Sequence, residues 1–94
     1  MSKLTTAAVK SGLEKLPGWS VSGESIVKQY TFPSFLEAMK FVNRVADVAE
    51  QEDHHPDILI NYRRVTLTLS THSEGGLTQK DFDLAATIEK RQSK

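Results

Sequence analysis

The 94-residue sequence contains no cysteine, which excludes both a disulfide framework and a thiolate metal site. It also lacks an excess of charge, because twelve basic residues balance twelve acidic ones, so no overall field would draw the chain to nucleic acid or an anionic membrane. No apolar stretch approaches the roughly 20 residues of a membrane span, and the opening residues lack the apolar run of a secretory signal. We therefore expect a soluble, cytoplasmic protein.

The chain is long enough for one hydrophobic core and too short for two. Ninety-four residues with 38% hydrophobic composition predict a single domain over residues 1–94. A domain of this size buries a modest share of its surface, so association with further copies would be a natural way to cover exposed apolar faces.

Hydrophobic periodicity predicts helices that alternate with β-hairpins. In chain order we expect a helix at 5–15, a hairpin at 19–32, a long helix from 34 to before Pro56, a hairpin at 58–71, and a helix from 78. Because the strands come in hairpins, this α-β-β-α-β-β-α order predicts an α+β domain with a four-stranded antiparallel sheet and the helices packed on one face. Lys28 interrupts the apolar face of the second strand, which indicates either an edge strand or a partly buried face.

The long helix is the most sharply defined element. Ser34 and Glu37 form an S-x-x-E capping box at its start. Its apolar stripe comprises Phe35, Ala38, Met39, Val42, Val45, Ala46 and Ala49. Phe41 and Val48 lie off this stripe, and either a wide buried face or a second contact, with a partner, would explain them.

All three histidines fall between Glu50 and Asp81, and two of them, His54 and His55, are adjacent. Pro56 holds His55 in an extended conformation, so the two imidazoles must diverge; they are poorly placed to share one metal but able to contact different atoms of one substrate. Strand alternation places His72 on the polar face of its hairpin. Because histidine titrates near neutral pH, the cluster favours proton transfer over three unrelated surface residues.

Two of the candidate residues also have ordinary structural explanations, and a further pair suggests a competing function. Asp81 fits a helix cap, paired with Thr78, as well as it fits a site. Trp19 fits a core aromatic as well as a ring-stacking platform. Glu50 and His54 have the i to i+4 spacing of a helical ligand pair, which leaves a metal-dependent hydrolase as a competing class.

The spacing Glu50-x3-His54-His55-Pro56-x5-Tyr62-x9-His72-x8-Asp81 resembles the signature of the pterin-4a-carbinolamine dehydratases. Ser70-Thr71 before His72, and Gly76-Leu77 after it, also match that family. The resemblance implies dehydration of 4a-hydroxytetrahydrobiopterin to quinonoid dihydropterin, which recycles tetrahydrobiopterin for aromatic amino acid hydroxylases. It implies a lyase that uses neither a metal nor an organic cofactor.

The resemblance also assigns roles to individual residues. The implied catalytic residues are His54, His55 and His72, and the implied substrate-binding residues are Glu50, Trp19, Asp81, Ser70 and Thr71. We expect His54 and His72 to share the acid and base roles, while His55 binds or orients the pterin.

Two kinds of protein partner follow from the same resemblance. It implies a homo-oligomer, a dimer or tetramer, with the sheet edge and the long helix as candidate contacts. It also raises an alternative function as a dimerisation coactivator of homeodomain transcription factors, with Phe41 and Val48 as the helical contact.

Overall fold

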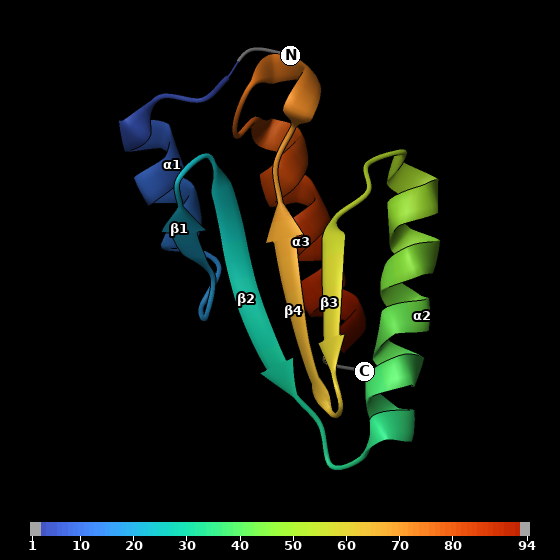
Figure 1. The fold of residues 1–94 in the computed structure, drawn as a ribbon. Coiled ribbons are helices and arrows are strands. Elements are labelled where there is room, and N and C mark those ends of the chain that lie inside the picture. The colour runs from blue at the N-terminus through green and yellow to red at the C-terminus, as the bar shows by residue number, and fades with distance from the viewer. Residues whose placement is uncertain (1–2, 93–94) are drawn as a thin grey trace.

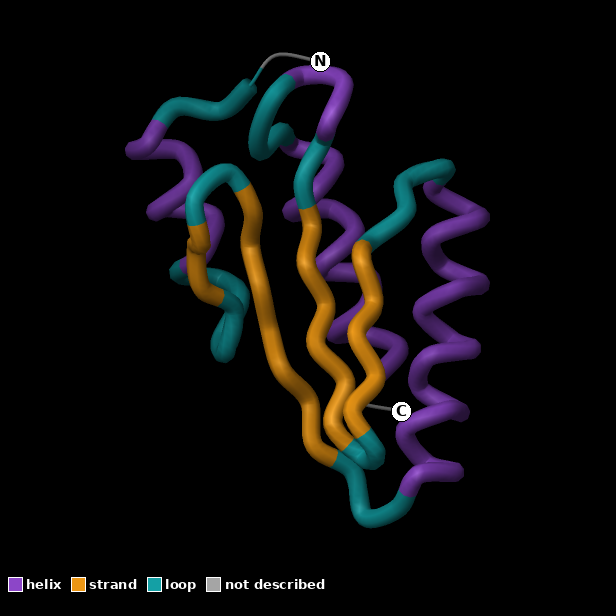
Figure 2. The backbone as a smooth tube through the Cα atoms, in the orientation of Figure 1, coloured by secondary structure: helices purple, strands orange, loops and turns teal. Residues whose placement is uncertain are grey.

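The computed structural model describes residues 3–92, which form one antiparallel sheet and three α-helices (Figures 1 and 2). In chain order the elements are α1 (Thr6–Leu13), β1 (Ser20–Ser22), β2 (Ser25–Thr31), α2 (Phe35–Glu52), β3 (Asp57–Asn61), β4 (Arg64–Leu69), the 3-10 turn η1 (His72–Glu74) and α3 (Gln79–Gln92). The predicted α+β class and element order are confirmed. Within residues 3–92, no helix combines the length and apolarity needed to cross a membrane.

The sheet has the strand order β1-β2-β4-β3, so each predicted hairpin forms and the two hairpins join through β2 and β4. β2 is therefore an interior strand, and the prediction that Lys28 could mark an edge is wrong. The reason is that the Lys28 ammonium has an acidic partner, Glu89, at 2.9 Å. A paired charge can sit on a half-buried strand face without the cost of an isolated one.

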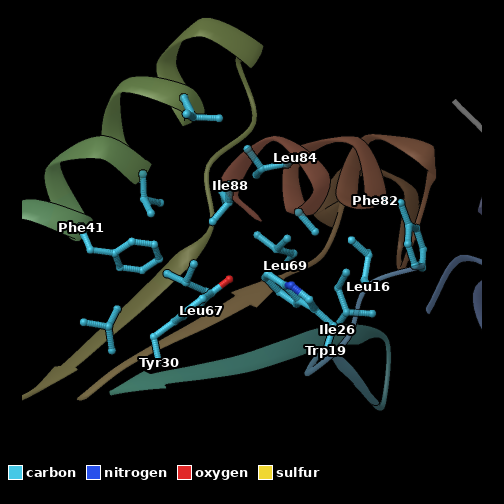
Figure 3. Close-up of a cluster of buried hydrophobic side chains, with 14 of the residues drawn as sticks. Leu16, Trp19, Ile26, Tyr30, Phe41, Leu67, Leu69, Phe82, Leu84 and Ile88 are labelled. Atoms are coloured by element: carbon cyan, nitrogen blue, oxygen red, sulfur yellow. The ribbon is translucent and has the colours of Figure 1, made fainter. Parts of the chain in front are cut away.

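The helices cover one face of the sheet, and the core lies between the two layers. Figure 3 shows Phe41 of α2 and Ile88 of α3 turned toward Leu67 of β4. α1 packs beside α3: a methyl group added at Gly12 would lie 2.8 Å from the Phe82 ring, so this close approach requires a residue without a side chain.

α2 begins as predicted, with the Ser34 side chain accepting a hydrogen bond from the Glu37 amide at 3.2 Å. Its buried face, however, is rotated from the predicted stripe. Phe41 and Val48 are 1% and 0% exposed, whereas Phe35 is 45% exposed. α2 packs against both α3 and the sheet, which buries a broader arc of the helix than one surface would. The two off-stripe residues are therefore core residues and not a free contact for a partner.

A polar cluster lies within the core around Glu89 of α3. One oxygen of its carboxylate, Oε2, accepts hydrogen bonds from the Tyr30 hydroxyl, from Trp19 Nε1 at 3.2 Å and from Lys28 Nζ at 2.9 Å. Burial raises the pKa of Tyr30 far above its ordinary value, and the Glu89 carboxylate adds to that effect. Burial of Glu89 by itself would raise its pKa, but hydrogen bonds from Tyr30 and Lys28 outweigh burial and hold that pKa below its usual range.

Candidate active site

All three histidines lie at the same end of the sheet, the upper end in Figure 1. His54 and His55 follow α2 and precede β3, while His72 follows β4. β3 and β4 are antiparallel, with Asp57 opposite Thr68, so the start of one strand meets the end of the other. α3 also begins at this end. The fold thus gathers residues from four elements that are well separated in sequence.

His54 is held by a buried aspartate. α2 ends at Glu52, and the backbone of its C-cap residue, Asp53, is left-handed (φ 51°) and turns the chain so that His54 points toward α3. There, His54 Nε2 lies 2.6 Å from Asp81 Oδ1, and the two side chains are 11% and 0% exposed. A carboxylate oxygen accepts, so Nε2 carries the hydrogen of this bond. The ring nitrogen left to face a substrate is therefore Nδ1.

Asp81 makes contacts of both kinds that the sequence left open, a helix cap and a bond to a candidate site histidine. Its Oδ2 accepts from the backbone amide of Thr78 at 3.0 Å, which completes a capping box at the start of α3. The same oxygen accepts from the Thr71 hydroxyl at 2.9 Å. Oδ1 remains for His54. The cap thus fixes the carboxylate that orients the histidine.

His55 turns to a different partner, as the proline geometry predicted. Its Nε2 lies 2.5 Å from Glu50 Oε2 in the last turn of α2, and both side chains are largely exposed. The adjacent imidazoles therefore diverge. Glu50 and His54, whose spacing suggested a helical ligand pair, do not face a common point. Within residues 3–92, no three His, Cys, Asp or Glu side chains gather in a way that could hold a metal ion.

His72 is exposed, as strand alternation predicted, although β4 ends three residues earlier and His72 itself opens η1. Its loop is closed at the base by Thr71 and Gly76, which exchange backbone hydrogen bonds of 3.0 and 3.3 Å. Gly75 adopts a left-handed conformation (φ 73°) and donates to the His72 carbonyl, which tightens the turn.

The remaining predicted site residues make hydrogen bonds within the protein. Thr71 is buried against Asp81, and the Ser70 hydroxyl donates to the carbonyl of Glu24 at 2.9 Å. Trp19 is only 6% exposed and bonds to Glu89, eight residues beyond Asp81 in α3. At ~1.5 Å per residue that is about 12 Å along the helix axis. Trp19 is therefore a core residue, and its contact with a substrate stays a prediction.

Sequence reasoning missed the hydroxyl of Thr78, which is fully buried and lies 2.8 Å from Thr71 Oγ1. The Thr78–Asp81 capping pattern was visible in the sequence, but it gave no sign that Thr71, two residues beyond β4, would add a third side chain to it.

Comparison with known proteins adds independent information. A model of the pterin 4 alpha carbinolamine dehydratase family matches residues 2–91. A candidate pterin-4-alpha-carbinolamine dehydratase of Thermomicrobium roseum is 49% identical over 88 residues, covering 94% of this chain and 95% of that protein. One from Acidobacterium capsulatum is 51% identical, covering 95% and 97%. The crystal structure of a transcriptional coactivator/pterin dehydratase from Brucella melitensis matches with a TM-score of 0.90 at 37% identity, covering 95% and 97%.

Proposed function

This chain belongs to the pterin-4-alpha-carbinolamine dehydratase family, and from that premise we propose that it dehydrates 4a-hydroxytetrahydrobiopterin to quinonoid dihydropterin. In the cell this reaction would recycle tetrahydrobiopterin for aromatic amino acid hydroxylases. The observation that carries the proposal is the His54–Asp81 pair, which orients one imidazole at the end of the sheet where His72 is exposed.

The chemistry requires two proton transfers at different atoms of one ring. The bond between C4a and the hydroxyl oxygen breaks, and that oxygen takes a proton and leaves as water. The proton on N5 passes to a base, and the electron pair it leaves forms the double bond between N5 and C4a. An acid and a base suffice for these steps, so our proposal includes neither a metal nor a cofactor.

The two histidines differ in ways that suit these two roles. A carboxylate bonded to Nε2 of His54 stabilises the imidazolium that forms when Nδ1 accepts a proton, so we assign the base role to His54. His72, exposed at the end of β4, is then the acid that protonates the leaving hydroxyl. His55, with Glu50 behind it, binds or orients the pterin.

The direct test is a stopped-flow assay with 4a-hydroxytetrahydropterin made enzymatically in the same mixture. We expect the purified protein to accelerate dehydration clearly above the spontaneous reaction, because acid and base groups would act on one bound ring. A rate equal to the spontaneous one, from protein shown to be folded by circular dichroism, would overturn the proposal.

We also propose that the protein is a homo-oligomer that forms through the β3 edge. β3 pairs only with β4, and its apolar side chains reach solvent on both faces: Ile58 is 36%, Leu59 63% and Ile60 38% exposed. An exposed apolar edge strand is a ready template for pairing with another chain. Analytical ultracentrifugation should give a dimer or larger, and Leu59→Lys should shift the mass toward the monomer. A monomeric wild type at micromolar concentration contradicts this proposal.

The alternative function as a transcriptional dimerisation coactivator has no comparable support in this chain. Its motivation was a free helical contact at Phe41 and Val48, and both side chains are buried in the core. The enzyme proposal therefore stands alone.

A further inference from the structure

The buried hydroxyl of Thr71 lies at the centre of a hydrogen-bond chain whose direction is fixed. A threonine hydroxyl has one hydrogen to donate, and Asp81 Oδ2, 2.9 Å away, accepts it. Thr78 Oγ1, 2.8 Å from Thr71 Oγ1, must then donate to Thr71. The Thr78 oxygen in turn accepts from the Lys80 amide at 3.3 Å. Donation thus runs from the first turn of α3 through two hydroxyls to Asp81 Oδ2, and the other oxygen of that carboxylate accepts from His54.

Every hydroxyl and carboxylate in this hydrogen-bond chain is buried, so the loss of any one bond has a large energetic cost. Thr71, Thr78 and Asp81 are 5%, 0% and 0% exposed. A buried polar group that loses its partner has no water to replace it, so removing the Thr71 hydroxyl leaves the Thr78 hydroxyl without an acceptor and Asp81 Oδ2 with the Thr78 amide as its remaining partner. The carboxylate would then be held less firmly in line with His54.

The backbone of Thr71 holds the other histidine. Its amide donates to the Gly76 carbonyl at 3.0 Å, and its carbonyl accepts from Gly76 and Glu74 at 3.3 and 2.9 Å. These bonds close the loop that begins with His72. One residue therefore contacts both halves of the site, through its side chain on one side and its main chain on the other.

We propose that Thr71 is a positioning residue that sets His54 and His72 relative to one another, its hydroxyl aligning Asp81 on His54 while its backbone fixes the loop of His72. This role rests on the proposed dehydratase function and replaces the expectation that Thr71 contacts the substrate. Thr71 touches no reacting atom; it acts through Asp81.

Thr71→Val tests the proposal, because valine keeps the shape and the backbone bonds but removes the hydroxyl. We expect kcat to fall about 10-fold with KM within about 3-fold of wild type, since the lost bond is one to a charged group. Thr71→Ser, which restores the hydroxyl, should return kcat to within about 2-fold. Thr66→Val, the same substitution at a half-exposed position of β4, should leave both constants unchanged.

A second readout does not depend on turnover. Nitrogen-15 NMR of the imidazoles, assigned with single histidine variants, should show the Nε2–H form of neutral His54 in the wild type and in Thr71→Ser. In Thr71→Val the Nε2–H signal should shift or broaden. An unchanged His54 signal with unchanged kcat would overturn the proposal, as would a serine variant that behaves like valine.

The two readouts also separate this proposal from the function on which it rests. If the wild type shows no dehydratase activity, the proposed function fails, and the NMR comparison still decides whether Thr71 positions His54. If Thr71→Val does not fold, Thr71→Ala removes the same hydroxyl and should change the same His54 signal, and no change there would overturn the proposal.

Discussion

His54→Ala should slow carbinolamine dehydration by about 10² to 10⁴-fold, the usual contribution of a positioned proton-transfer group. The expectation follows from the buried Asp81 behind His54, because a fixed carboxylate both orients the ring and stabilises its charged form. His72→Ala should give a loss of the same order, in the other proton transfer. Stopped-flow measurement of kcat and KM for both variants provides the test.

The comparison with His55 makes this assignment specific. His55 bonds to Glu50 at the exposed end of α2, and in our proposal it binds the pterin without moving a proton. His55→Ala should therefore raise KM more than it lowers kcat. Rates within a few-fold of wild type for both His54→Ala and His72→Ala would show that the acid and base lie elsewhere.

The sequence predicted those parts of the fold that depend on local chemistry. The capping box at Ser34 fixed the start of α2, and alternation fixed both hairpins. Pro56 was enough to predict that His54 and His55 diverge, because a proline restricts the residue before it wherever the chain goes. The family signature then predicted that the three histidines belong to one site, and the fold places all three at the same end of the sheet (Figure 1).

Contacts between segments that are distant in the sequence could not be predicted from local patterns. Trp19 and Glu89 are 70 residues apart, so nothing in either local pattern showed that the indole would bond to α3 at a position about two turns beyond Asp81. Phe41 stayed ambiguous for a related reason: helical periodicity finds the most apolar direction, whereas α2 is covered by both α3 and the sheet, which confirms the wide buried face over the partner contact. Asp81 stayed ambiguous because the cap it forms is local and its bond to His54 is not.

The largest effect on stability is expected at Glu89. In Glu89→Leu, the Tyr30 hydroxyl, the Trp19 indole and the Lys28 ammonium lose their shared acceptor. Leaving a mostly buried charge and two buried donors unpaired should lower the free energy of unfolding by about 2 to 4 kcal/mol, allowing for partial exposure of the pair. Urea denaturation measures the change. Glu52→Leu, at an exposed position, should change it by less than about 0.5 kcal/mol.

A double variant separates the buried charge from the lost packing. In Glu89→Leu the Lys28 ammonium is left without its charge partner. Lys28→Met removes that ammonium, so the double variant should be more stable than Glu89→Leu alone. If the double variant were less stable than either single one, the Lys28–Glu89 charge pair would not be the source of the effect.

The same cluster sets the pH range of stability. The pKa of Glu89 is lowered on folding, so its contribution is full above its ordinary pKa of 4.5 and is lost as pH falls below that value. The pKa of Tyr30 is raised on folding, so its contribution is full below its ordinary pKa of 10.0 and is lost as pH rises above it. The free energy of unfolding should therefore decline on both sides of that window, and Glu89→Leu should flatten the acid side. An acid slope equal to that of wild type would place the lost protons on other carboxylates.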